Sequence, residues 1–175
     1  MNSDLNSEVI REHFSTHDFF YAPSYLPSSI CQEAIATIAE LPVINLPTDG
    51  GDVYSQVLGE MPLVLQEIGK KLCHLLAKAS EQSLFSSPLM SQEIIKYRDG
   101  AALSRHRDNE GNAKSKVLLT LNGNARFGIE GQVFGIEEGD LIILRGREFS
   151  DTPTPEHETF LNYRRYVLLT EPNYD

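Results

Sequence analysis

A chain of 175 residues is long enough for one domain with a sizeable core, and 41% hydrophobic with 23% charged residues is ordinary for a soluble globular protein. The formal net charge is −10, which disfavours binding to nucleic acid because such binding depends on neutralising phosphates, although eleven of the fifteen basic residues lie in 96–175. No secretory leader and no apolar run of roughly 20 residues is present, so we expect a cytoplasmic protein without membrane contact.

The N-terminal part of the chain predicts support structure. Residues 1–16 are polar and are expected to be disordered, and residues 17–27, with four aromatics and two prolines, are expected to be extended. A helix should follow, capped by Ser29 with Gln32 in the capping-box position. Its apolar face is formed by Ile30, Ala34, Ile35, Ile38 and Leu41.

Residues 41–55 are interrupted by two prolines and a Gly-Gly pair, so a loop with at most a short strand is expected there. Pro62 is placed to open a second helix that ends near Ala79. Cys31 and Cys73 lie within the two helical patterns, which favours reduced core thiols over a disulfide.

From residue 91 the hydrophobic period changes from helical to two. Seven short β-rich runs, separated by Gly, Asn and Asp turns, indicate a sandwich or jelly roll: QEIIKYR, ALSRHRD, KVLLTLNG, ARFGIE, QVFGIE, DLIILRG and ETFLNYRRYVLLT. Because the helices precede the strands, we expect an α+β fold with the helices packed on one face of the sheet. The whole chain, 1–175, is expected to be a single domain, in which 17–90 is helical support and 91–171 is the jelly-roll core.

The segment YRDGAALSRHRD (97–108) carries a histidine and an aspartate two residues apart after a glycine turn. On a strand, His106 and Asp108 would share one face. His157 is the only histidine downstream, and it opens the last β run. Two histidines and one carboxylate form the facial triad that holds iron(II) and leaves one side open for substrate and oxygen. The three residues are therefore the predicted metal ligands and catalytic centre.

A guanidinium lies eight residues past His157. A hairpin near 161–163 would bring Arg165 beside the metal strand, where its fork could bind a carboxylate, either of a structural Glu or of a dicarboxylate cosubstrate. Arg164 must face away if Arg165 faces inward, and the sequence leaves open which of the two is inside.

With these motifs the chain resembles the Fe(II)/2-oxoglutarate dioxygenase superfamily, and within it the AlkB-like branch. The resemblance covers roughly residues 60–170. Its most specific part is YRDGAALSRHRD, which is similar to the family's Tyr-x-x-Gly followed by His-x-Asp. VLLTLNGNARFGI is similar to the family's next hairpin, EEGDLIILRG to its Gly-Asp strand, and RRYVLLT to the closing strand with the cosubstrate arginine.

The resemblance implies a double-stranded β-helix (jelly roll) core and a set of roles. His106, Asp108 and His157 would bind Fe(II), Arg165 would hold the distal carboxylate of 2-oxoglutarate, and Tyr97 would hydrogen-bond this cosubstrate. With O2, such an enzyme hydroxylates its substrate or removes an N-methyl group, and it releases succinate and CO2. A core or interface role for Tyr97 is the alternative.

Three departures from the AlkB-like pattern bear on the substrate. Ile95 stands where the family often has Asn, and the stretch between 41 and 61 is short for a nucleotide-recognition lid. In the Arg-x-Asn-x-x-x-Arg pattern of the repair enzymes, Val167 replaces the Asn and Glu171 replaces the second Arg. Together with the acidic charge they favour a small molecule, an amino acid or a protein side chain over an alkylated nucleobase in DNA or RNA. The alternative of another class is a non-catalytic, cupin-like binding module. The sequence does not determine the oligomeric state.

Overall fold

The computed structural model describes residues 5–48, 51–82, 90–108, 114–150 and 154–174. Within them the helices are α1 (Ser7–Phe14), α2 (Ser28–Ile38) and α3 (Leu63–Ser80). Three strands lie between these helices in the sequence: β1 (Phe19–Ala22), β2 (Val43–Thr48) and β3 (Gly51–Val57). The later strands are β4 (Met90–Tyr97), β5 (Leu103–His106), β6 (Lys116–Ile129), β7 (Gln132–Ile136), β8 (Leu141–Leu144) and β9 (His157–Pro172).

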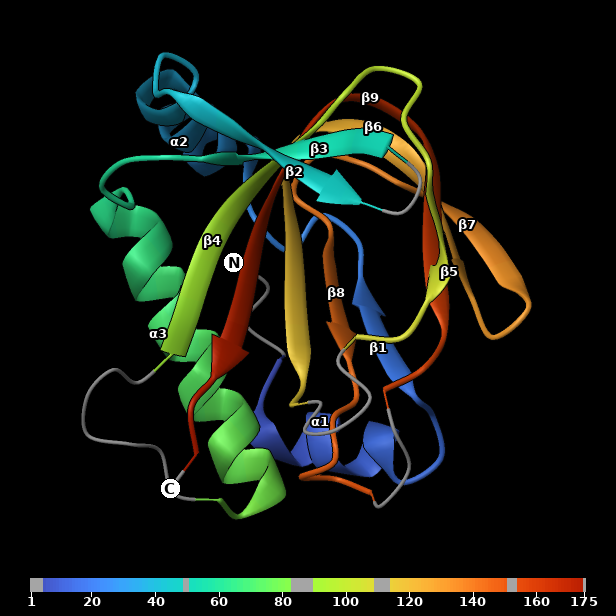
Figure 1. Ribbon diagram of the computed structural model, residues 1–175. Coiled ribbons are helices and arrows are strands. Elements are labelled where there is room, and N and C mark those ends of the chain that lie inside the picture. The colour runs from blue at the N-terminus through green and yellow to red at the C-terminus, as the bar shows by residue number, and fades with distance from the viewer. Residues whose placement is uncertain (1–4, 49–50, 83–89, 109–113, 151–153, 175) are drawn as a thin grey trace.

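The strands form two antiparallel layers joined by β6 and β9 (Figure 1). The first layer has the order β1-β8-β6-β9-β4-β3-β2 and uses the N-terminal part of β6 with the C-terminal part of β9. The second layer has the order β7-β6-β9-β5 and uses the other parts of the same two strands. This arrangement is a double-stranded β-helix, so the predicted fold class is confirmed.

The long strands differ from the sequence prediction. We expected hairpins within 117–129 and near 161–163, but each segment is one continuous strand that passes from one layer to the other. The passage is made by irregular backbone: Gly123 has φ +76°, and Leu161 and Arg164 also have positive φ. Residues with positive φ interrupt the hydrogen-bond ladder and bend a strand without reversing its direction. Residue types that favour turns therefore do not end β6 and β9.

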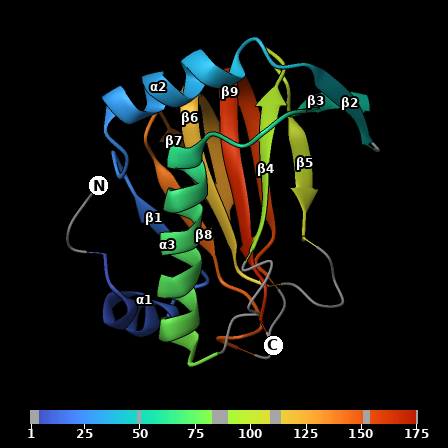
Figure 2. The same cartoon turned by 90° about the vertical axis from the view of Figure 1, so that its left-hand side faces the viewer.

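The helices cover the outer face of the first layer, as predicted (Figure 2). Alternate residues of β6 and β8, among them Val117, Leu119 and Ile143, are buried against the helices. The helical stripe of α3 supplies Leu65, Leu72 and Leu76 to the same cluster. The residues between them on β6 face the opposite way, into the space between the layers, and this alternation leaves that space for a site.

The N-terminal predictions need three corrections. Residues 7–14, expected to be disordered, form α1, because Ile10 and Phe14 are one helical turn apart and both are buried in the core. Asn6 caps this helix and accepts hydrogen bonds from the backbone N–H groups of Glu8 and Val9. Ser29 does not cap α2, which begins at Ser28 after Pro27 with no side-chain cap.

The third correction concerns residues 41–55, expected to be a loop. They contribute most of a β2–β3 hairpin whose second strand pairs with β4. An edge strand tolerates proline because one of its sides needs no ladder hydrogen bonds, and β2 is the last strand of its layer. Residues 17–90 therefore contribute strands as well as helices.

The second predicted helix is confirmed: α3 begins directly after Pro62 and runs to Ser80. Both cysteines are free and buried, and burial raises the pKa of Cys31 to about 11 and that of Cys73 to about 12. In the described part of the chain, no helix is both long enough and apolar enough to cross a membrane.

Candidate metal centre

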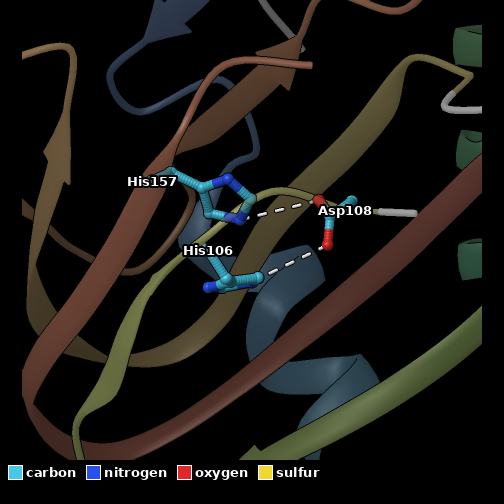
Figure 3. Close-up of side chains that lie close together, drawn as sticks. All are labelled: His106, Asp108 and His157. Atoms are coloured by element: carbon cyan, nitrogen blue, oxygen red, sulfur yellow. Dashed lines mark ion pairs between the residues drawn. The ribbon is translucent and has the colours of Figure 1, made fainter. Parts of the chain in front are cut away.

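The three predicted ligands come together between the layers (Figure 3). His106 is the last residue of β5 and pairs in register with His157, the first residue of β9. Asp108 follows two residues after β5, and its carboxylate faces both imidazoles (Figure 3). The Nε2 atoms of His106 and His157 lie 3.7 and 3.6 Å from the two Asp108 oxygens, and the three ligand atoms lie within 4.8 Å of one another.

Backbone contacts fix which nitrogen of each imidazole faces the centre. Nδ1 of His106 lies 2.7 Å from the carbonyl oxygen of Ser104, and Nδ1 of His157 lies 3.2 Å from that of Pro155. A carbonyl only accepts, so each Nδ1 carries the hydrogen and donates it. In the neutral ring Nε2 then has the free lone pair, which is the arrangement of a metal-bound histidine held by a second hydrogen bond.

The surroundings of His157 favour the neutral ring. Its side chain is 6% exposed and stacks on Phe127 with ring centroids 5.7 Å apart. Burial lowers the pKa of His157, against the opposing attraction of Asp108. A neutral imidazole is the form that donates a lone pair to a metal, so this histidine is suited to ligation at neutral pH.

A pocket of about 110 Å³ opens beside the three ligands. Its other walls come from the inward faces of β3, β4, β6 and β9. The lining side chains besides the ligands are Tyr54, Glu93, Ile95, Tyr97, Leu103, Lys116, Leu118 and Leu169. The pocket thus combines an apolar floor with a small number of charged groups, as small-molecule sites usually do.

Of the two candidate arginines, Arg165 faces inward and Arg164 is exposed. The Arg165 side chain is only 1% exposed. Its Nη1 donates to Thr159 Oγ1 and Asn162 Oδ1, both at 3.0 Å, while its Nε has no hydrogen-bond partner. Among the described residues no carboxylate lies within ion-pair distance, and burial lowers its pKa to about 10.

Tyr97 packs against this guanidinium. The Arg165 Cζ atom lies 5.1 Å from the centroid of the Tyr97 ring, and the ring of Tyr54 lies 5.7 Å away on β3. Burial raises the pKa of Tyr97, so the phenol stays protonated and can donate a hydrogen bond. The contact of Tyr97 with a cosubstrate stays a prediction.

Sequence analysis missed two charged residues of the pocket. Lys116 is 9% exposed, lies 3.8 Å from Asp108 and forms a close ion pair with Glu171. Burial lowers the pKa of Lys116, but the three nearby carboxylates outweigh it and the net shift is upward, so the ammonium stays charged. Glu93 lies on β4, four residues before Tyr97 and on the same face. Tyr97 was predicted from the family resemblance, but a period of two counted back from it could have indicated Glu93, and the same period links Lys116 to Leu118.

Solved structures of low sequence identity share this fold. A prolyl-4-hydroxylase from Pseudomonas putida matches with a TM-score of 0.70 at 15% identity, over 95% of this chain and 98% of that one. A prolyl hydroxylase from Trichoplax adhaerens, in complex with a peptide fragment of the hypoxia inducible factor oxygen degradation domain, matches with 0.69 at 16% identity, over 97% and 89%. An oxidoreductase of the 2OG-Fe(II) oxygenase family from Burkholderia pseudomallei matches with 0.61 at 14% identity, over 97% and 91%.

Sequence comparison gives no closer relation. No family model matches the chain, and no curated protein matches it. At 14–16% identity the structural likeness establishes the double-stranded β-helix fold.

Proposed function

We propose that this chain is an Fe(II)- and 2-oxoglutarate-dependent oxygenase that hydroxylates or oxidatively N-demethylates its substrate. Iron would be held by His106, Asp108 and His157, whose ligand atoms already lie within 4.8 Å of one another. Two histidines and one carboxylate are the donor set of non-heme iron(II) oxygenases. The named activities of proteins with the same fold support this assignment.

The observation that carries the proposal is the buried guanidinium of Arg165. A charged group that is 1% exposed and has no carboxylate partner among the described residues is costly unless an anion joins it. A carboxylate that enters the pocket would supply that partner. The distal carboxylate of 2-oxoglutarate fits this requirement, whereas a cupin-like binding module has no use for it.

Each residue then has a defined task. His106 and His157 present Nε2 because their Nδ1–H groups are held by backbone carbonyls. Arg165 binds and orients the distal carboxylate, and Tyr97 donates a hydrogen bond to the cosubstrate. Iron(II), when bound, supplies the one-electron chemistry that couples O2 to oxidative decarboxylation, with succinate and CO2 as products.

Apolar side chains would exclude water from the cosubstrate site. Ile95, Leu118 and Leu169 line the pocket between the charged groups. Water excluded by these side chains cannot weaken the ion pair at Arg165, because electrostatic attraction grows as the local dielectric falls.

The substrate is proposed to be a small molecule, an amino acid or a protein side chain. Two of the structures with this fold are prolyl hydroxylases, one of them bound to a peptide, and the net charge of −10 opposes attraction to phosphates. The AlkB-like branch, and with it demethylation of nucleobases, stays a prediction from the motif YRDGAALSRHRD. Salt-dependent binding of single-stranded oligonucleotide would favour that alternative.

The test is an anaerobic titration of the metal-free protein with Fe(II) and then 2-oxoglutarate, followed by visible absorption. A weak charge-transfer band should appear when both are present. In Arg165→Gln the band should require at least about tenfold more 2-oxoglutarate, because a charge-assisted pair is lost.

The matched control is Arg164→Gln, which removes the same charge from the neighbouring exposed position. This variant should titrate like the parent protein. A folded protein that binds iron but gives no band with 2-oxoglutarate would contradict the proposal and favour the non-catalytic jelly roll.

A further inference from the structure

The pocket has two ends that differ in charge. Strand register orders its floor: Ile95 lies beside Val167, and Glu93 lies beside Leu169. Tyr97, with Arg165 packed against its ring, therefore lies at one end of the floor, and Lys116, paired with Glu171, lies at the other. Glu93 stands on the same strand face as Tyr97, four residues nearer to the Lys116–Glu171 end.

Glu93 is the third charged residue of this second end. Lys116 is already engaged, since its ammonium lies between Asp108 and Glu171. Among the described residues no donor lies within hydrogen-bond or ion-pair distance of the Glu93 carboxylate, although the side chain is half-buried and lines the pocket. A partly buried carboxylate without a close partner raises the free energy of the folded protein. A cation bound from solution would offset that penalty.

The charges of the other groups leave Glu93 in excess. This step rests on the proposed function, in which iron(II), Asp108, 2-oxoglutarate and Arg165 together carry no net charge. Lys116 and Glu171 cancel each other as an ion pair. Lys116 also attracts Glu93, but one ammonium cannot balance both Glu171 and Glu93, so the loaded pocket keeps one net negative charge.

We infer that the substrate carries a single positive charge, an ammonium or guanidinium group, which binds Glu93 at the end of the pocket away from Arg165. Glu93 is thus a specificity-determining residue. The 2-oxoglutarate would occupy the Arg165 end, which leaves the opposite end, beside Glu93, for the cation of the substrate. Free amines and basic side chains of peptides share this chemistry.

The test measures binding without turnover. The protein is loaded with Mn(II), which suits carboxylate and imidazole ligands and is paramagnetic, together with 2-oxoglutarate. Proton relaxation of three probes of similar size is then compared: butylammonium, butanol and pentanoate. Butylammonium should relax fastest because it alone is drawn to the metal pocket.

Variants assign the selectivity to one residue. In Glu93→Gln the preference for butylammonium should fall about tenfold or more, because a hydrogen bond between charged groups is lost. Glu33→Gln makes the same change on the exposed face of α2 and should keep the full preference. Nα-acetyl-lysine methylamide, compared with butylammonium, distinguishes the sources: a stronger effect for the amide indicates a peptide side chain.

The outcomes separate the two proposals. Equal relaxation of the three probes, or an unchanged preference in Glu93→Gln, overturns the cationic substrate while Mn(II) and 2-oxoglutarate binding in the same sample keep the proposed function. Failure to bind Mn(II) or 2-oxoglutarate overturns the proposed function, and the cationic substrate falls with it.

Discussion

Asp108 lies next to the other polar side chains of the candidate metal centre. One carboxylate lies 3.7 Å from His106, 3.6 Å from His157 and 3.8 Å from Lys116. None of these distances is a hydrogen bond, and the two imidazoles and the carboxylate can together offer their lone pairs to a metal ion. Removal of this carboxylate should therefore affect metal binding more than folding, because Asp108 lies outside the strands and outside the hydrophobic clusters.

Asp108→Ala should weaken Co(II) binding at least about 100-fold and abolish 2-oxoglutarate turnover. Loss of a residue behind a metal ligand already costs about 10- to 100-fold in affinity, and loss of a ligand should cost no less. Co(II) absorption reports the affinity, and circular dichroism reports the fold.

The control for Asp108 is Glu60→Ala, which removes an exposed carboxylate outside the pocket. It should bind Co(II) like the parent protein. Full turnover by Asp108→Ala would show that the triad is assigned wrongly.

At the scale of elements, the crossing of β6 and β9 holds the two layers together. Gly123 lies at this crossing with φ +76°, and a Cβ atom there would lie 2.1 Å from the carbonyl oxygen of Tyr163. Because the obstacle is backbone, the neighbouring chain cannot move aside as a side chain could. Gly131 has φ +77° in the β6–β7 turn, but a Cβ atom there would meet nothing within 4 Å.

The pair separates two effects. Gly131→Ala should cost about 1 kcal/mol of unfolding free energy, from the positive φ alone. Gly123→Ala should cost about 3 kcal/mol or more, since the steric clash adds to the same backbone term. Urea denaturation of the two variants measures the difference, and equal losses would mean that the crossing relaxes around the added methyl group.

The same crossing shows which secondary-structure elements can be predicted from the sequence and which cannot. Local spacing predicts α3 and most strands, because period and helix-start signals need no knowledge of the partner strand. It does not predict that β6 and β9 run on through Gly123 and Leu161, because only the pairing between them decides whether a bend becomes a turn. It also misses α1, where two buried anchors, Ile10 and Phe14, fix a segment that is otherwise polar.

For the molecule as a whole, part of the candidate site can be predicted from the sequence and part cannot. His106 and Asp108 are close in sequence, and His157 is the only histidine downstream, so a metal site could be predicted. Glu93, Lys116 and Glu171 lie close together because of the register between β4, β6 and β9. No local sequence pattern predicts this proximity.

Charge placement also sets the stability of the whole fold. Burial raises the pKa of Glu93, with Lys116 opposing the shift and Glu171 adding to it. A carboxyl group whose pKa is higher in the folded than in the unfolded chain favours folding while it is protonated. That contribution is present below the unfolded pKa and is lost as the pH rises through the folded pKa.

Glu93→Gln should therefore raise the thermal midpoint of the metal-free protein at about pH 7, because the neutral amide avoids the burial cost of a carboxylate, and the gain should shrink at about pH 4. Differential scanning calorimetry in the presence of a chelator measures both. Glu33→Gln, on the exposed surface, should leave the midpoint nearly unchanged at either pH. A loss of stability in Glu93→Gln at neutral pH would mean that the carboxylate already has a partner in the free protein, and it would remove the reason for expecting a cationic substrate.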